Sequence, residues 1–245
     1  MKIAVISDLH SNLEALSKCV AHANEQGVER YVCLGDIVGY GADPEATLQL
    51  LLSLPGLVAV RGNHDVAMFE ELSVATPSAI RQVTEWTRDR LKPVHRQFLQ
   101  DLPILHREGV ATFVHASAAE PDTWPYLRMD DEVQACMDEA GTPLTFIGHV
   151  HVPKVFYRTP EGTVRELDPV SGVPVPLSSA LQFVINVGSV GQPRDGNNAA
   201  CYAIFDDAAL HVTFHRLPYD FHTTAAKILA ASLDPFFAER LAEGR

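Results

Sequence analysis

Short apolar runs alternate with segments of helical periodicity through the first sixty residues. Residues 3–6 predict a buried strand, and apolar side chains then recur at helical spacing until Gly27. Residues 31–34 predict a second strand, Pro44 opens a second helix, and residues 57–60 predict a third strand. Because strand and helix alternate in this order, the N-terminal part predicts a parallel sheet.

The pattern becomes helical over residues 66–100 and is then dominated by strands. Further strands are expected at residues 110–114, 144–147, 155–158, 163–167, 183–187, 201–205 and 210–214, and helices over 131–140 and from Thr223 onward. No internal repeat or clear linker interrupts the pattern, so residues 1–245 are expected to form a single domain.

The charge of the chain limits its partners. The 245 residues include 31 acidic and 19 basic side chains, a net charge of −12. Such a charge argues against duplex nucleic acid and against an anionic membrane as partners. The N-terminal apolar run is too short for a signal peptide, and Pro55 and Gly56 interrupt the apolar stretch of residues 48–60, so we expect a cytoplasmic protein without a membrane span. The four cysteines form no C-x-x-C pair and are expected to be buried thiols.

Residue types that bind metals or transfer protons follow five of the expected strands directly. They are Asp8 and His10 after the first strand, Asp36 after the second, Asn63, His64 and Asp65 after the third, His115 after residues 110–114, and His149 and His151 after residues 144–147. Open α/β sheets bind ligands at the carboxyl ends of their strands. A capped turn or a surface histidine would explain one such ending, but five together favour a metal site.

The mixture of carboxylate, imidazole and amide donors suits Mn²⁺, Fe²⁺ or Zn²⁺. In an extended loop, residues i and i+2 point to the same side, so Asp8 with His10, and His149 with His151, are expected to converge. Seven candidate ligands are too many for one tetrahedral ion but suit two ions that share a carboxylate. Two divalent ions would leave a net positive charge in an acidic protein, and phosphate fits such a site.

These motifs resemble the calcineurin-like metallophosphoesterase superfamily. Its pattern D-x-H, G-D, G-N-H-[DE], H and G-H-x-H is present as Asp8-Leu9-His10, Gly35-Asp36, Gly62-Asn63-His64-Asp65, His115 and Gly148-His149-Val150-His151. The stretches LGDIVGYG, VGSVGQPRDG and YDFHTTAAKILAASL are similar to the bacterial branch related to diadenosine tetraphosphatases. The resemblance implies an α/β fold, a four-layer α/β/β/α sandwich with two mixed β-sheets packed face to face and helices on both outer faces.

The resemblance also implies a role for each motif residue. Asp8, His10 and His151 would hold one ion, Asn63, His115 and His149 would hold the other, and Asp36 would bridge the two. His64 would act as a general acid or as a hydrogen-bond donor to the leaving oxygen, and Asp65 would fix its ring. Manganese is the favoured ion, with iron and zinc as alternatives. His149 and His151 are thus expected to bind different ions.

The expected function is that of a dimetal-dependent phosphoesterase, a hydrolase that acts on a phosphomonoester, a phosphodiester or a nucleotide polyphosphate. The resemblance implies that a metal-bridging hydroxide attacks phosphorus. The alternatives are a phosphoprotein phosphatase and a catalytically weak metal-binding scaffold for protein partners. A small phosphorylated substrate, nucleotides included, is the expected partner, and the oligomeric state is left open.

Two candidate substrate contacts lie outside the motifs. Asn12 follows the first metal-binding segment, and Arg194 lies in the glycine-rich loop 187–196. Asn12 could instead cap the following helix, and Arg194 could instead pair with Asp195. The sequence leaves both alternatives open.

Overall fold

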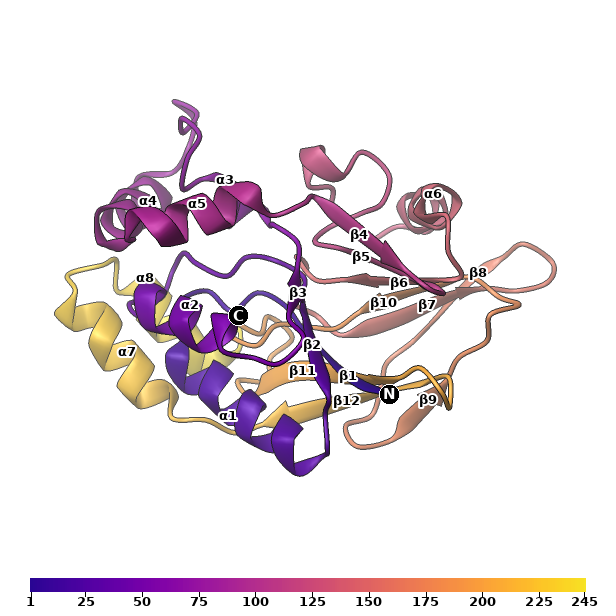
Figure 1. Ribbon diagram of the computed structural model, residues 1–245. Helices are drawn as coiled ribbons and strands as arrows, with labels where there is room; N and C mark the ends of the chain where they lie inside the picture. Colours follow the sequence, from indigo (N-terminus) through magenta and orange to yellow (C-terminus); the bar gives the residue numbers. More distant parts are fainter.

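Two six-stranded mixed sheets stack face to face in the computed structural model, which describes residues 1–245 (Figure 1). Helices cover both outer faces, so the predicted four-layer α/β/β/α sandwich is confirmed. The first sheet has the order β3-β2-β1-β11-β12-β9 and the second has the order β4-β5-β6-β10-β7-β8.

The first sheet begins with the three parallel strands that the sequence predicts. Its members are β1 (Lys2–Ile6), β2 (Arg30–Cys33), β3 (Val58–Ala59), β9 (Pro174–Pro176), β11 (Ala200–Asp206) and β12 (His211–Leu217). Strand β1 pairs with β2 in parallel, Ile3 opposite Arg30, and β2 pairs with β3 in the same sense. The long hairpin of β11 and β12 joins the other side of β1 in antiparallel orientation.

The second sheet places β6 between two parallel neighbours. Its members are β4 (Leu105–Glu108), β5 (Ala111–Val114), β6 (Leu144–Ile147), β7 (Lys154–Arg158), β8 (Val164–Leu167) and β10 (Phe183–Asn186). Strands β5 and β10 flank β6 in parallel, and the predicted hairpin of β7 and β8 is confirmed. The sequence did not predict β4 or β9. Both lie at a sheet edge and are only partly buried, so neither carries a continuous apolar run.

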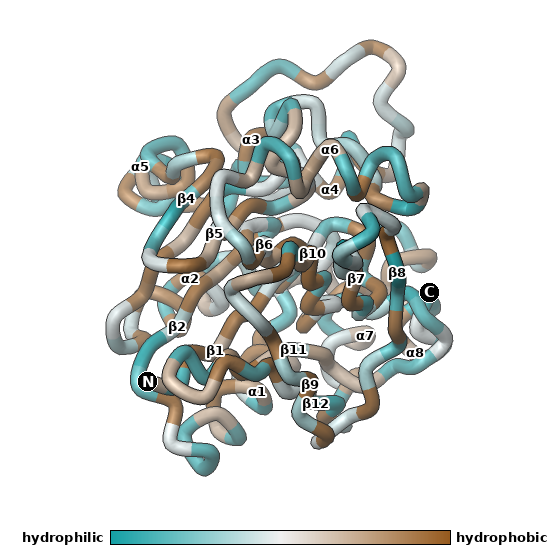
Figure 2. Tube along the Cα trace, turned by 90° about the vertical axis from the view of Figure 1, so that its right-hand side faces the viewer, coloured by the Kyte–Doolittle hydropathy of each residue, from teal (hydrophilic) through white to brown (hydrophobic).

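The hydrophobic core between the sheets is built by side chains from both of them. Val5 and Phe205 from the first sheet pack with Phe113, Phe146 and Ile185 from the second. Figure 2 shows the same arrangement as brown segments along inner strands such as β6 and β10. Burial of this apolar surface holds the two sheets together, which fixes the relative position of their strand ends.

The helices lie outside the sheets. They are α1 (Leu13–Glu25), α2 (Pro44–Leu52), α3 (Asn63–Val66), α4 (Ser78–Arg90), α5 (Pro93–Asp101), α6 (Asp130–Ala140), α7 (Phe221–Ala230) and α8 (Phe236–Glu243). Helices α1 and α2 pack on the first sheet, and α6 packs on the second. Helices α7 and α8 pack with α4 and with Tyr40. None of the eight helices is both long enough and apolar enough to span a bilayer. The four cysteines are buried and unpaired, as expected.

Candidate metal centre

The carboxyl ends of strands from both sheets meet at one edge of the sandwich. Asp8 and His10 follow β1, Asp36 follows β2, Asn63 begins α3 after β3, His115 follows β5, and His149 and His151 follow β6. All are buried except Asn63, which is partly buried. Because these strands run parallel within each sheet, residues far apart in the sequence share one polar cluster inside the protein.

The carboxylates and imidazoles of this cluster form two groups that share one member. The first group contains Asp8, His10, Asp36 and His151, and the second contains Asp36, His115 and His149. Within each group the ligand atoms lie within 4.8 Å of one another. One oxygen of Asp36, Oδ2, lies 3.7 Å from His10 Nε2 and 3.4 Å from His115 Nε2. The cluster could therefore hold metal ions, with Asp36 common to both groups.

Each of the four imidazoles is oriented by a backbone carbonyl. The bonded atoms are His10 Nδ1 with Val38 at 3.2 Å, His115 Nδ1 with Leu34 at 2.9 Å, His149 Nε2 with Trp124 at 3.1 Å, and His151 Nδ1 with Gln192 at 2.6 Å. A carbonyl can only accept, so the bonded nitrogen carries the proton and the other nitrogen of a neutral ring presents a lone pair. These second nitrogens face each other in pairs, 3.3 Å apart for His10 and His151 and 3.1 Å apart for His115 and His149. Facing lone pairs repel unless a cation or a proton lies between them.

Two oxygen atoms of the predicted metal ligands have no hydrogen-bond partner. They are Asp8 Oδ1 and Asn63 Oδ1, and both atoms are buried. A buried acceptor without a partner destabilises the fold by roughly 1–3 kcal/mol, and by more if it is charged. Oxygen and imidazole donors without thiolate are the ligands that Mn²⁺, Fe²⁺ and Zn²⁺ accept, so the residues present fit a divalent metal.

The two carboxylates are ionised despite their burial. Burial opposes the charge on Asp8, but the imidazole of His151, 3.1 Å from Oδ1, holds the pKa of this carboxyl below its usual value. Burial also opposes the charge on Asp36, whose pKa is held well below its usual value by His115 and His64. The cluster therefore keeps a negative charge that attracts cations.

The imidazoles of the cluster differ in the direction in which their pKa is shifted. Burial lowers the pKa of His10 well below its usual value, and burial together with the neighbouring His115 lowers the pKa of His149 to about 4. Burial acts on His115 in the same direction, but Asp36 outweighs it and raises the pKa of His115 to about 9. Without a metal, the proton on His115 thus supplies the positive charge beside Asp36.

Most of the cluster residues have a left-handed backbone conformation. The φ angles are 54° for Asp8, 47° for His10, 51° for Asp36, 63° for His149 and 62° for His151. Such conformations are unfavourable for side chains with a Cβ, and they persist where the surrounding structure enforces them, often at functional sites. The expected extended loops are therefore wrong: Asp8 and His10 converge through a turn, and His149 and His151 point into different groups.

Gly148 allows the two sheets to meet at the cluster. A Cβ added to it would lie 2.5 Å from Asp8 Oδ2 and 2.7 Å from Ser7 Cβ, closer than real Cβ atoms approach other atoms. The backbone N–H of His149 donates to this same Asp8 oxygen at 3.1 Å. A side chain at position 148 would therefore displace Asp8, so the glycine serves close packing of the β1 and β6 loops.

His64 lies beside the cluster but in neither group. Its ring meets His10 edge-on, with centroids 5.1 Å apart, and meets Tyr40 at 4.4 Å. Burial lowers its pKa, and the charge of Arg194 acts in the same direction. A buried imidazole at the rim of a metal cluster can donate a hydrogen bond or a proton to a bound substrate.

Asp65 does not hold the ring of His64, so this expectation is wrong. Its Oδ1 accepts from the backbone N–H groups of Ile37 and Val38 at 2.9 and 3.3 Å, and its Oδ2 accepts from Gly62 at 2.9 Å. Burial and the nearby Asp36 raise the pKa of Asp65 to about 7. Asp65 is therefore a backbone anchor that ties the loop after β2 to the start of α3.

Asn12 is a helix cap rather than an available substrate contact. Its Oδ1 accepts from the N–H of Ala15 at 3.1 Å, and its Nδ2 donates to the carbonyl of Gly191 at 2.8 Å. The residue is 1% exposed. Its polar atoms are thus used within the protein, as the alternative of a helix cap predicts.

Arg194 is not paired with the neighbouring Asp195. Asp195 forms an ion pair with Arg216 instead. The guanidinium carbon of Arg194 lies 5.8 Å from the ring centroid of Tyr40, and its Nη2 donates to Gln192 Oε1 at 2.9 Å. Arg194 therefore faces the side of the cluster where His64 lies, and it keeps its charge free for an anion.

Aromatic residues of the 117–128 loop complete the other side of the cluster, and the sequence did not reveal them. The ring of Tyr126 stacks on His149 with centroids 4.3 Å apart, and Arg128 lies 4.9 Å above Tyr126. The carbonyl of Trp124 holds His149, as described above. These residues lie in an irregular segment without a motif, so only the folded chain brings them to the site.

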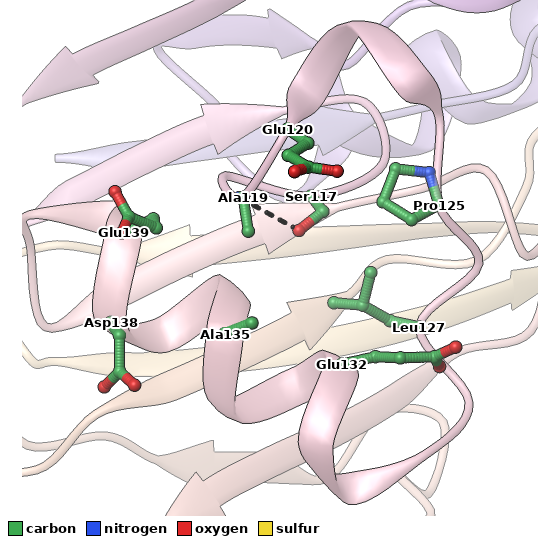
Figure 3. A pocket seen from close by; sticks show the side chains of 9 residues that line it. All are labelled: Ser117, Ala119, Glu120, Pro125, Leu127, Glu132, Ala135, Asp138 and Glu139. Carbon is green, nitrogen blue, oxygen red and sulfur yellow. Dashed lines mark hydrogen bonds between the residues drawn. The ribbon is translucent and has the colours of Figure 1, made fainter.

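A cavity of about 620 Å³ lies between this loop and α6, apart from the histidines (Figure 3). Carboxylates from the loop and from the helix line it, among them Glu120, Glu132 and Asp138. None of the cluster residues contributes to its wall. Its negative lining does not suit a phosphorylated ligand, so the cluster, rather than this roomier cavity, is the candidate site.

Comparison with known proteins gives the same family as the motifs. The model of the calcineurin-like phosphoesterase superfamily domain matches residues 1–208. The uncharacterized protein MJ0912 of Methanocaldococcus jannaschii is 36% identical over 250 residues, which cover 99% of this chain and 98% of that protein. The crystal structure of a metallophosphoesterase from Sphaerobacter thermophilus is 39% identical, has a TM-score of 0.89 and is covered to 99%, with all of this chain aligned. Protein PH1004 from Pyrococcus horikoshii OT3, at 19% identity, a TM-score of 0.79 and coverage of 100% and 98%, shares the fold.

Proposed function

Because the chain belongs to the calcineurin-like phosphoesterase superfamily, we propose that its buried cluster binds two divalent cations and hydrolyses phosphate esters. The observation that carries the proposal is the position of Asp36, whose carboxylate is common to both ligand groups. A shared carboxylate is what a two-cation site requires. The substrate is a small phosphomonoester, phosphodiester or nucleotide polyphosphate.

The proposed ligands follow the two groups. Asp8, His10 and His151 hold one cation, Asn63, His115 and His149 hold the other, and Asp36 bridges them. The Oδ1 atoms of Asp8 and Asn63 have no hydrogen-bond partner. This supports one oxygen ligand besides Asp36 for each cation. The donor set favours Mn²⁺, with iron or zinc as alternatives. His149 and His151 thus bind different cations although only one residue separates them.

Two bound cations would acidify a water molecule and stabilise the charge that develops on the phosphoryl group. The chain itself provides orientation and a proton donor. His64 Nδ1 lies against the backbone of Gly39, since a Cβ added to this glycine would lie 2.8 Å from the nitrogen. The other ring nitrogen, Nε2, is therefore the one that donates to the leaving oxygen. The guanidinium of Arg194 lies on the same side and is placed to contact the bound substrate.

The proposal is tested with protein stripped of metal and reloaded with Mn²⁺, Fe²⁺, Co²⁺ or Zn²⁺. We expect hydrolysis of p-nitrophenyl phosphate or of its bis-ester, and a bound-metal content that approaches two Mn²⁺ per chain. The absence of turnover with all four metals would rule out the enzyme and favour a metal-binding scaffold. Turnover with only one bound ion would contradict the shared role of Asp36.

A further inference from the structure

Two arginines converge on the ring of Tyr40 at the rim of the candidate site. The guanidinium carbon of Arg194 lies 5.8 Å from the ring centroid, and that of Arg240 lies 6.0 Å from it. The same ring meets His64 at 4.4 Å and His10 at 4.5 Å. Tyr40 is therefore the side chain near which both guanidinium groups and both histidine rings lie.

Contacts between distant segments hold Arg240 in this place. Arg240 lies in the C-terminal helix α8, which packs with α7 and with Tyr40. The carbonyl of Gly244 accepts from the N–H of Gly196 at 2.9 Å, which ties the end of α8 to the loop that carries Arg194. Phe237 packs against Tyr40 with centroids 5.2 Å apart. The position of Arg240 is thus built into the fold.

Neither arginine forms an ion pair with an Asp or Glu side chain. No Asp or Glu oxygen lies within 4.0 Å of either guanidinium group, since Asp195 pairs with Arg216. Arg194 Nε is buried without any hydrogen-bond partner, whereas Arg240 Nε donates to an oxygen of the carboxyl group of Arg245, the last residue in the sequence. Burial lowers the pKa of Arg240 to about 10, and the charge of Arg194 adds to the effect. The buried, unpartnered Nε of Arg194 is a donor that a bound anion would satisfy, and Arg240 adds a second positive charge near the same tyrosine ring.

Only one arginine of the pair, Arg194, lies in the region that the family model matches. The family match covers residues 1–208, so α8 and Arg240 lie beyond it. All proposed metal ligands and His64 lie within it. A residue outside the shared region that reaches the rim of the site is placed to select the substrate rather than to perform the common chemistry.

We propose that Arg194 and Arg240 form a second phosphate subsite, which binds a phosphate group carried by the leaving group of the substrate. The inference rests on the proposed function, in which His64 marks the leaving-group side. Guanidinium N–H groups bind phosphate oxygens in pairs, and Arg194 Nε is a buried donor ready for one of them. The substrate is therefore a compound with two phosphate groups.

The reaction is an ordinary hydrolysis. A water oxygen forms the new bond to phosphorus while the bond from phosphorus to the leaving oxygen breaks. The leaving oxygen takes a proton, and the products are orthophosphate and an alcohol that still carries the second phosphate. The arginine pair binds this second phosphate throughout and takes no part in the bond changes.

The test compares substrates that differ only in the far end of the leaving group. We would measure kcat/KM with excess Mn²⁺ for alkanediol bisphosphates of two, three and four carbons and for the matching hydroxyalkyl monophosphates. The wild-type protein should prefer at least one bisphosphate by about tenfold or more, since only the bisphosphate makes the charge-assisted hydrogen bonds to the guanidinium groups. Arg240→Gln should reduce this preference by about tenfold, and Arg194→Gln combined with Arg240→Gln should abolish it.

Arg165→Gln is the matched control, because it removes a positive charge from an exposed side chain on β8, which contributes no residue to the proposed subsite. It should leave the preference unchanged. A second readout does not depend on turnover: the preferred bisphosphate should protect Arg194 and Arg240 from phenylglyoxal, as measured by peptide mass spectrometry, and the monophosphate should protect them far less.

Three results would overturn the second subsite. They are equal kcat/KM values for bisphosphates and monophosphates at all three lengths, an equal loss for both in Arg240→Gln, and a preference for a carboxylate analogue over the bisphosphate. Each of these results counts against the second subsite only when the same protein hydrolyses p-nitrophenyl phosphate. Failure to hydrolyse any ester with any metal would instead contradict the proposed function.

Discussion

The substitution Gly148→Ala tests whether the close approach of the two sheets controls metal binding. Two hydrogen bonds fix the backbone at position 148. Its N–H donates to the carbonyl of His115 at 2.9 Å, and its own carbonyl accepts from Asn186 Nδ2 at 2.8 Å. A new Cβ would lie 2.5 Å from Asp8 Oδ2, whereas real Cβ atoms rarely come closer than 3.0 Å. Asp8 must therefore move by about 0.5 Å, which exceeds the ~0.2 Å tolerance of metal–ligand distances.

We expect two separable effects of this shift. Affinity for the cation held by Asp8, His10 and His151 should fall by about 10–100-fold, the range seen when the support of a ligand is disturbed. The free energy of unfolding of the metal-free protein should fall by about 1–3 kcal/mol through overpacking. Titration calorimetry with Mn²⁺ and denaturant unfolding measure the two quantities independently.

Two further variants separate the causes. Gly162→Ala has the same added methyl group in open space, although its φ of 85° makes it strained, so it should lose stability without losing metal. Gly148→Ala combined with Ser7→Gly relieves the contact with Ser7 but not the contact with Asp8, so it should regain stability without regaining affinity. If Gly148→Ala alone binds two Mn²⁺ with wild-type affinity, the role assigned to Gly148 and Asp8 is wrong.

Three other substitutions test separate parts of the site and fold. His64→Ala should keep both metals and lose about 10²–10⁴-fold in kcat, and a drop in metal content would show that His64 is a ligand. Asp36→Ala should lose both cations by metal analysis, whereas retention of two per chain would exclude a bridge. Burial beside His22 lowers the pKa of His215 to about 4, below its ordinary 6.5. As the pH falls, the unfolded chain therefore binds the proton before the folded chain does, and stability is lost between about pH 6.5 and about pH 4. Because His215 is partly exposed, we discount its contribution to about 1 kcal/mol. His215→Phe should reduce the difference between the free energies of urea unfolding at pH 7 and at pH 4 by this amount. An unchanged pH dependence would contradict the assignment.

The sequence alone determined the parts of this protein that depend on local pattern. Buried strands are continuous apolar runs, so β1, β2, β5 and β6 could be recognised, and parallel strands place their carboxyl ends at one edge. The polar residues directly after these strands could therefore be identified as neighbours from the order of the strands and loops. Edge strands such as β4 carry a weaker pattern and were missed.

The tertiary structure decided what each of those polar residues contacts. Left-handed turns at His149 and His151 send the two rings to different groups, and local pattern cannot reveal a φ angle that the packed loops impose. Asp65 and Asn12 bind backbone groups of other segments instead of the site, as only the folded loops show. Arg240 reaches Tyr40 across two hundred residues because α8 packs against the N-terminal loops. Such long-range contacts arise from the packing of whole elements, so no stretch of sequence near either residue encodes them.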